Sequence, residues 1–484
     1  MGPIVAAAIR RTYGTGERGG MAQEQGYDVA FLGGGTGGYV AAIRASQLGL
    51  RAVVIEKDLV GGTCVHRGCI PAKALLKSAS VATLVKDAKG YGVTPGKISL
   101  DYTTAMTRAR KVVDQNYKGI QFLFKKHKID VVEGWGTITG SGAISVEKDG
   151  QTTEVRAGSI VIDTGSTPRP IDGIPVDGKR VFTSDHATTE PFLPKRVIVR
   201  GGGATGLEFA SVYREFDCEV TLVGRVAPNE DADVQKDLAR AFQRQGIRVL
   251  SNVRPSASDF EVSDDGVKLR VNVDGKDETI EADALLVAIG RYGNIEGFGL
   301  ENLGVNVADG YITVDDYMRT NVENVYAIGD VTGLQQLAHT AMHQGVVAVE
   351  AIAGHKPEVL DYNKIPWVTY CHPEVGSVGL TEAKARDAGH NVKIGKFPLS
   401  ANGKARVENE TIGFAKMVVD ADTDQILGIH LLGGHATELI SVGGLAMLFE
   451  ATAWELGITT FPHPTISEVL HEAALDSDGM ALHF

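Results

Sequence analysis

Two glycine-rich turns constrain the fold of this chain more than any other feature of its sequence. Residues 27–57, YDVAFLGGGTGGYVAAIRASQLGLRAVVIEK, and residues 196–225, RVIVRGGGATGLEFASVYREFDCEVTLVGR, each read as a buried strand, a glycine turn, a helix and a second strand. The spacing G-x-G-x-x-G is formed by Gly33, Gly35 and Gly38 in the first segment and by Gly201, Gly203 and Gly206 in the second. The first glycine of such a turn allows the bend, the second lets the backbone approach a pyrophosphate, and the third lets helix pack on strand.

The flanking elements decide how this motif is interpreted. A G-x-G-x-x-G spacing alone also occurs in surface loops, but here each copy follows a strand and opens a helix, which is the context of a dinucleotide site. The helix N-terminus then offers free N–H groups to a pyrophosphate. The sequence therefore predicts an α/β fold with two Rossmann-like dinucleotide-binding domains.

An acidic residue about 20 positions after the first glycine binds a ribose hydroxyl in such domains. In the first segment this residue is Glu56, which lies 23 positions after Gly33. In the second segment the same count from Gly201 reaches Gly224, which Arg225 follows. The first site is therefore expected to take an unphosphorylated ribose, while the second site lacks the acid.

Composition excludes several classes of partner. The formal net charge of −12 and the absence of a basic run argue against binding to nucleic acid or to anionic membranes. No segment approaches the roughly 20 apolar residues of a membrane span. The four cysteines in 484 residues indicate a reducing, cytoplasmic compartment. Residues 1–20 precede Met21 and are expected to form a disordered extension, with an organelle transit peptide as the alternative.

Two of the four cysteines, Cys64 and Cys69, lie in the segment GGTCVHRGCIPAK at residues 61–73. A zinc site is disfavoured because no second Cys/His cluster accompanies them, and inert core thiols would not explain the neighbouring glycines and proline. In a regular helix their Cα atoms would be about 8–9 Å apart, whereas a disulfide tolerates about 7 Å. A redox pair therefore needs a distorted helix start, which Gly68 permits and Pro71 favours by removing an N–H from the carbonyl of Arg67.

The ordered set of motifs resembles the flavin-dependent pyridine nucleotide-disulfide oxidoreductases over nearly all of residues 21–484. Besides GGTCVHRGCIPAK, the matching segments are TGSTPRP (164–170), LLVAIGR (285–291), TNVENVYAIGDVTG (320–333), LAHTAMHQG (337–345), HPEVGSVGLTE (372–382) and FPHPTISE (461–468). The resemblance implies a C-terminal α+β dimerisation domain and a homodimer. It divides the chain into the extension 1–20, an FAD-binding domain at 21–168 that returns at 294–364, an NAD(P)-binding domain at 169–293 and an interface domain at 365–484.

The same resemblance assigns residues to two cofactors, FAD and NAD, and to no metal. The FAD residues it implies are Gly33, Gly35, Gly38, Glu56, Lys57, Gly62, Thr63, Lys73, Gly136, Thr164, Gly165, Ser166, Asp330 and Ala338. The NAD residues it implies are Gly201, Gly203, Gly206, Glu208 and Gly290.

The catalytic residues follow from the resemblance in the same way. Cys69 is expected to lie against the flavin and Cys64 to exchange with substrate, while Lys73 pairs with Glu208 near the flavin. His463 is expected to act as the base that deprotonates the incoming dithiol, because its ordinary pKa suits that task. Glu468 is expected to orient it, and the pair would act on the disulfide of the other subunit.

Within the family, CIPAKALL, the GLE after the second glycine turn and the C-terminal GMALHF without a cysteine pair favour FAD-dependent oxidation of protein-bound dihydrolipoyl groups. NAD⁺ would be the acceptor, and the partner would be the lipoyl domain of a 2-oxo acid dehydrogenase complex or a related lipoyl protein. An NADPH-dependent reductase of a small disulfide such as glutathione is the alternative, and a non-catalytic flavoprotein that serves as a structural partner is a remoter one.

One region departs from the family pattern. Gly224 replaces the ribose-binding acid in a loop about three residues short, and Arg200 stands where an aliphatic residue is usual. Arg225 suits the phosphate of NADP, but Glu230, Asp231 and Asp233 follow closely and are expected to repel it. NAD therefore remains the expected second nucleotide, with NADP as the other possibility.

Overall fold

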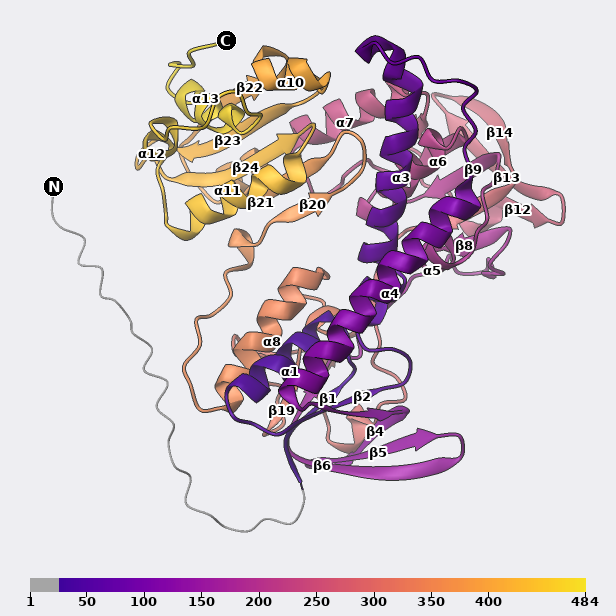
Figure 1. Ribbon diagram of the computed structural model, residues 1–484, viewed down its shortest axis with the longest axis vertical. Coiled ribbons are helices and arrows are strands. Elements are labelled where there is room, and N and C mark those ends of the chain that lie inside the picture. The colour runs from indigo at the N-terminus through magenta and orange to yellow at the C-terminus, as the bar shows by residue number, and fades with distance from the viewer. Residues whose placement is uncertain (1–25) are drawn as a thin grey trace, which may run out of the picture.

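A computed structural model describes residues 26–484, so the extension expected at residues 1–20 lies outside the described residues. The described chain forms two α/β units and a C-terminal unit with an antiparallel sheet, which confirms the predicted fold class. Figure 1 shows the first unit at one end of the molecule, and the second and C-terminal units at the other. The domain boundaries remain predictions.

The first unit is built on a sheet whose parallel part has the order β3–β2–β1–β6–β19. Its strands are β1 (Tyr27–Leu32), β2 (Ala52–Glu56), β3 (Asp130–Glu133), β4 (Trp135–Gly140), β5 (Ala143–Lys148), β6 (Gln151–Ile162) and β19 (Val325–Ala327). Its helices are α1 (Thr36–Gln47), α2 (Gly62–His66), α3 (Cys69–Asp87), α4 (Tyr102–His127) and α8 (Ala338–Ile352). β1 and β2 are almost wholly buried apolar runs, as parallel strands covered on both faces should be.

The second unit repeats this plan around a five-stranded parallel sheet, β11–β10–β9–β15–β8. Its strands are β8 (Val181–Thr183), β9 (Arg196–Arg200), β10 (Glu219–Val223), β11 (Arg248–Leu250) and β15 (Ala284–Val287), and its helices are α5 (Ser184–Thr189), α6 (Ala204–Glu215) and α7 (Ala232–Arg244). A second, antiparallel sheet holds β12 (Phe260–Ser263), β13 (Gly266–Val273) and β14 (Lys276–Ala282). The chain enters and leaves this unit through paired strands β7 (Ser166–Pro168) and β16 (Arg291–Gly293).

The C-terminal unit has the antiparallel order β20–β21–β24–β23–β22. Its strands are β20 (Trp367–Thr369), β21 (Val375–Gly379), β22 (Val392–Pro398), β23 (Phe414–Asp420) and β24 (Ile426–Leu432). Its helices are α9 (Glu382–Asp387), α10 (Gly403–Glu408), α11 (Ala436–Leu448), α12 (Ala453–Gly457) and α13 (Glu468–Asp476). α11 and α12 leave Leu448, Phe449, Trp454 and Ile458 more than half exposed, an apolar surface that a dimer would cover.

One described stretch, Gly62–Tyr91, is long and apolar enough to cross a membrane by length and composition alone. On that criterion the expectation that no segment would qualify was wrong. The stretch is a core helix, because Leu75 and Ala79 of α3 are buried with Met106 of α4 and Phe209 of α6 in one cluster. Figure 1 shows α3 running from the first unit along the second, so this helix joins the two nucleotide-binding units.

Candidate active site

The first glycine turn is a cradle in which the backbone segments touch. A Cβ atom on Gly33 would lie 2.1 Å from the carbonyl oxygen of Asp163, and one on Gly38 would lie 2.3 Å from the carbonyl oxygen of Gly33. α1 begins beyond Gly35 without a side-chain cap from that residue, and among its first amides that of Gly38 donates to the carboxylate of Asp163. The glycines let backbone approach the helix N-terminus closely, which fits the pyrophosphate of FAD.

Glu56 closes this cradle at the end of β2. Its carboxylate accepts a hydrogen bond from the Gly34 amide at 2.8 Å and another from the Asp58 amide at 2.9 Å. Burial raises the pKa of Glu56, and the bond from Gly34 opposes that shift. The ammonium of Lys57 lies 4.3 Å from the ring centroid of Trp135. Beside Trp135, Gly136 leaves no room for a side chain, because a Cβ atom there would lie 2.5 Å from Cδ1 of Leu32. The acid is therefore fixed beside the glycine turn, where a ribose would meet it.

The crossing between the first two units gathers the predicted residues Thr164, Gly165 and Ser166. Thr164 donates to the carbonyl of Asn294 at 2.7 Å, and the carbonyl of Gly165 accepts from the amide of Asn294 at 3.0 Å. Ser166 donates to the carboxylate of Asp330, whose pKa burial raises. Ala338 is the first residue of α8, and that helix also starts without a side-chain cap. Asp330 therefore lies at the crossing between the two units, where the family resemblance places it beside the flavin.

Asp163 is a central residue of the cradle that no sequence motif singles out. Its carboxylate accepts the Gly38 amide at 2.7 Å, and Cβ atoms on Gly35 and Gly329 would both lie within 3.0 Å of its oxygens. Asp163 is 6% exposed, and burial raises its pKa well above the usual range. It is 125 residues from Gly38 in the chain and belongs to no motif considered there, so only the fold reveals the contact.

Replacing Asp163 with alanine is expected to lower the affinity for FAD and the free energy of unfolding. The change would leave the Gly38 amide without its acceptor at the centre of the turn, a loss of about 1–3 kcal/mol. The bound fraction of FAD, measured from flavin absorbance, and a urea melt test this. Asp163→Asn keeps an acceptor oxygen and should retain more FAD than Asp163→Ala, so equal FAD loss in both variants would contradict a role through this hydrogen bond.

The second glycine turn has the same close contacts. A Cβ atom on Gly201 would lie 2.0 Å from the carbonyl oxygen of Ala288, and one on Gly206 would lie 1.9 Å from that of Gly201. Nothing lies within 4 Å of the corresponding position on Gly203, so the turn is open at its second glycine. Gly290 follows β15 with φ +120° and accepts from the Arg169 amide at 2.9 Å. This cradle also fits a dinucleotide pyrophosphate.

The two cysteines lie on separate helices, because the helix is interrupted between them. α2 ends at His66, and α3 begins at Cys69 after Gly68, whose φ and ψ are −127° and −110°. A Cβ atom on Gly68 would lie 3.0 Å from the Thr63 carbonyl oxygen, so a larger residue would crowd the turn. The carbonyl of Arg67, which Pro71 leaves without a helical donor, accepts the hydroxyl of Thr188 at 2.8 Å. The expected distortion is present.

The thiols of Cys64 and Cys69 lie within hydrogen-bonding reach of each other, in the dithiol form. The hydrogen bond from Cys64 lowers the pKa of Cys69 to about 7, against the effect of burial and with help from the charge of Lys73. The same bond, together with burial, raises the pKa of Cys64. The pair therefore carries one thiolate near neutral pH, and that thiolate is on Cys69.

The reduced enzyme is expected to lose the ultraviolet absorbance of this thiolate as the pH falls through about 7. The pKa of Cys69 is depressed, so its charged form persists above that pH and is protonated below it. Lys73→Met removes a nearby positive charge and should move the midpoint to higher pH. Cys69→Ser should remove the transition, whereas a transition unchanged in Cys69→Ser would show that another group titrates.

Lys73 and Glu208 connect α3 with α6. The ammonium of Lys73 lies 2.9 Å from both carboxylate oxygens of Glu208, which also accepts the Tyr370 amide at 3.1 Å. Glu208 is 5% exposed. Burial lowers the pKa of Lys73, but the charge of the Glu208 carboxylate outweighs this effect, so the pKa of Lys73 is raised. The structure thus holds a positive charge beside Cys69, between the two glycine cradles.

His463 and Glu468 are brought together at the start of α13, where Nδ1 of the imidazole lies 2.9 Å from a carboxylate oxygen. Burial opposes ionisation of Glu468, but the amide of Thr465 and the imidazole lower its pKa. The side chain of His463 is 79% exposed, and no described contact joins it to Cys64 or Cys69. In Figure 1, α13 lies on the side of the C-terminal unit turned away from α3. The structure therefore forms the pair but not its contact with the dithiol of the same chain.

Among the described residues, no group of three or more His, Cys, Asp or Glu side chains is arranged to hold a metal ion. Of the other two cysteines, Cys218 is 2% exposed and Cys371 is 1% exposed, and burial raises the pKa of both. The dithiol is therefore the accessible sulfur chemistry of the described chain.

Comparison with known proteins bears on these sites. The family model described as pyridine nucleotide-disulphide oxidoreductase matches residues 27–345, and the one described as its dimerisation domain matches residues 365–474. A dihydrolipoyl dehydrogenase from Bacillus subtilis is 46% identical over 470 residues, which cover 95% of this chain and 99% of that protein. One from Zymomonas mobilis is 44% identical over 464 residues, with the same coverage. The crystal structure of LpdA from Mycobacterium tuberculosis has a TM-score of 0.85 at 29% identity and covers 92% of this chain and 98% of that chain.

Proposed function

The chain belongs to the pyridine nucleotide-disulphide oxidoreductase family, and on that premise we propose that it is a dihydrolipoyl dehydrogenase. It oxidises a dihydrolipoyl dithiol to the cyclic disulfide and passes two electrons to NAD⁺ through FAD. The observation that supports this most directly is the dithiol of Cys64 and Cys69, which lies at the junction of α2 and α3, and α3 packs along both nucleotide-binding units. When bound, FAD supplies two-electron chemistry between sulfur and nicotinamide.

The unequal pKa values of the two thiols support their proposed roles. In thiol–disulfide exchange, the sulfur with the lower thiol pKa is the better leaving group. In the oxidised enzyme, a substrate thiolate therefore attacks Cys64 and displaces Cys69 as the thiolate. The second substrate sulfur then displaces Cys64 to close the lipoyl ring. Lys73 lies beside the charge that forms on Cys69 and is itself fixed by Glu208.

His463 is the proposed base in this exchange. It takes the proton of the attacking substrate thiol and gives it to the sulfur of Cys64 when the second substrate sulfur displaces that sulfur, while Glu468 holds the ring through Nδ1. The family's dimerisation domain supports a homodimer, and we place the imidazole at the dithiol of the other subunit. The proposed substrate is the lipoyl group on a lipoyl domain of a 2-oxo acid dehydrogenase complex or a related lipoyl protein, met in the cytoplasm.

The test is steady-state turnover of the FAD-loaded dimer with dihydrolipoamide and NAD⁺, followed by NADH absorbance. We expect turnover of at least about 1 s⁻¹, in the ordinary range of enzymes. A protein that retains FAD and its dithiol but forms no NADH from dihydrolipoamide would refute the proposal. Activity with NADPH and oxidised glutathione in its place would instead identify a reductase of small disulfides.

A further inference from the structure

In the second unit, positive charge takes the place of the missing ribose acid. Gly202 and Gly224 correspond in sequence spacing to Gly34 and Glu56, which hydrogen-bond in the first unit. A Cβ atom on Gly224 would lie 3.3 Å from the amide nitrogen of Gly202 and 3.4 Å from Nη1 of Arg200. The guanidinium of Arg200 therefore lies beside the position from which an acid would project.

Two more arginines lie around this position. Arg254 is close enough that its charge, after burial, is a cause of the lowered pKa of Arg200. Arg225 follows Gly224 directly, and its carbonyl oxygen would be 2.1 Å from a Cβ atom on Gly202, so its backbone is held against the glycine turn. Among the described residues, no ion pair joins any of these three arginines to a carboxylate, and Nη1 of Arg200 donates to the carbonyl of Val223 at 3.4 Å. We call Arg200, Arg225 and Arg254 the arginine cluster.

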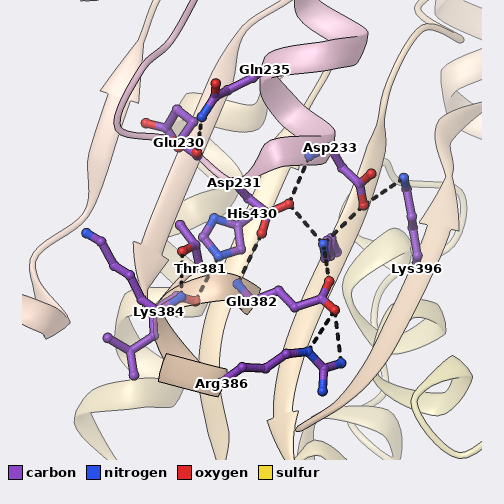
Figure 2. Close-up of polar contacts among 12 residues, drawn as sticks. Glu230, Asp231, Asp233, Gln235, Thr381, Glu382, Lys384, Arg386, Lys396 and His430 are labelled. Carbon is purple, nitrogen blue, oxygen red and sulfur yellow. Dashed lines mark hydrogen bonds and ion pairs between the residues drawn. The ribbon is translucent and has the colours of Figure 1, made fainter. Parts of the chain in front are cut away.

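The acids expected to repel a phosphate here are engaged elsewhere (Figure 2). Lys416 of β23 is 3% exposed and lies 2.9 Å from Asp231 and 3.0 Å from Asp233. Lys396 of β22 lies 3.2 Å from Asp233. The expected repulsion of a phosphate by Asp231 and Asp233 is therefore weakened, because lysines of the C-terminal unit pair with both carboxylates.

Glu230 also faces the C-terminal unit, but through a hydroxyl and not through an ion pair among the described residues. Its carboxyl lies against Ser377 of β21, and burial raises its pKa, with a contribution from the neighbouring Asp231. It is thus directed to the C-terminal unit and is less readily ionised than a surface carboxylate. The loop after Gly224 therefore holds the backbone of Arg225 against the second glycine turn and directs its acids toward the C-terminal unit.

We infer that the adenosine end of the second site binds a 2′-phosphate, so that the enzyme uses NADP⁺ alongside NAD⁺. The inference rests on the proposed function for its reaction. In that reaction the two S–H bonds of the dihydrolipoyl group break and one S–S bond forms. Two electrons and one proton reach NADP⁺ to give NADPH, and the other proton is released to solvent. Guanidinium groups are suited to this ligand because they donate paired hydrogen bonds to phosphate oxygens.

A binding experiment tests the inference apart from thiol chemistry. Adenosine 2′,5′-bisphosphate and AMP are titrated calorimetrically into the FAD-loaded dimer, in which the first site is filled. We expect the bisphosphate to bind at least about tenfold more tightly, as charge-assisted bonds to one phosphate would produce. Bisphosphate binding no tighter than AMP would overturn the inference, and would mean that the arginines only fill the space left by the shortened loop.

Substitutions in the arginine cluster test whether its side chains cause the tighter binding of the bisphosphate. Arg200→Gln and Arg254→Gln should each weaken the bisphosphate by about fivefold or more and leave AMP within about twofold. Arg240→Gln is the matched control, because Arg240 is in the same unit but pairs with Asp237 on the surface of α7 at 3.2 Å. If Arg200→Gln weakened the binding of the bisphosphate and of AMP equally, Arg200 would support the fold and would not bind the 2′-phosphate.

Kinetics separate this inference from the proposed function. With dihydrolipoamide as donor, kcat/KM for NADP⁺ should lie within about tenfold of that for NAD⁺. Turnover with NAD⁺ and a value for NADP⁺ more than tenfold lower would overturn the inference and leave the function intact. Turnover with neither nucleotide would refute the function, and the bisphosphate titration would still decide what the second site binds.

Discussion

Replacing Cys64 with serine is expected to lower kcat/KM for dihydrolipoamide by a factor on the order of 10³ or more, as loss of a reacting nucleophile does in other enzymes. A serine hydroxyl cannot form the disulfide that substrate attacks, and Cys69 then has no partner sulfur within reach. FAD should remain bound, because the contacts of the glycine cradle involve backbone and Asp163. Turnover by NADH absorbance and FAD content by flavin absorbance give the two readouts.

Cys218 provides the matched control. It is 2% exposed in the core that surrounds α3 and α6, and burial raises its pKa to about 12, so its thiol is neither accessible nor ionised. Cys218→Ser should cost stability, about 1–3 kcal/mol for a buried hydroxyl without a partner, and keep turnover. Substantial dihydrolipoamide oxidation by Cys64→Ser, or its loss in Cys218→Ser with the fold intact, would contradict the assignment of the redox pair.

Replacing His463 with glutamine is expected to lower kcat about 10²- to 10⁴-fold, the usual contribution of a positioned general base. The imidazole is exposed, and its one described polar partner is Glu468 at Nδ1, which leaves Nε2 available for a substrate thiol. Glu468→Gln keeps a hydrogen-bond acceptor beside the ring and should cost less than the loss of the ring. A His463→Gln enzyme with unchanged kcat across the pH range would exclude the imidazole as the base.

A mixed dimer tests whether His463 acts across the subunit interface. A dimer of one Cys64→Ser subunit and one His463→Gln subunit contains one intact dithiol and one intact imidazole on different chains. If the imidazole serves the partner's dithiol, one of the two sites is complete and about half the activity returns. If each chain uses its own imidazole, both sites are defective and the mixed dimer is as inactive as its parents.

The sequence predicts the two glycine cradles and the helix distortion because each depends on residues close together in the chain. The turn at Gly33–Gly38 is marked by its own glycines, and the break between Cys64 and Cys69 follows from Gly68 and Pro71. Lys73 and Glu208 are 135 residues apart, so their pairing came from the family resemblance. The cofactor and catalytic roles of these residues remain predictions.

What the sequence could not predict are contacts made between distant units. Asp163 lies at the end of β6 and meets the glycine turn only because β6 pairs with β1. The acids after Gly224 are expected from the sequence to repel a phosphate, because they follow a predicted nucleotide-binding segment closely in the chain. The partner of Asp231 and Asp233 is Lys416, which is 185 residues from Asp231 and on another unit, so the local sequence pattern does not indicate it.

The turn between Cys64 and Cys69 belongs to the first unit, but residues of the second unit hold it in place. Thr188 of α5 holds the carbonyl of Arg67 between the cysteines, and Glu208 of α6 holds Lys73 one helical turn beyond Cys69. A small rotation of the second unit about its connecting strands therefore displaces the dithiol. By thermodynamic linkage, if oxidation of the cysteines changes the affinity of this unit for its nucleotide, then nucleotide binding shifts the redox equilibrium of the cysteines by the same factor. Through these two hydrogen-bonded contacts, the second unit can influence the reactivity of a cysteine pair that belongs to the first unit.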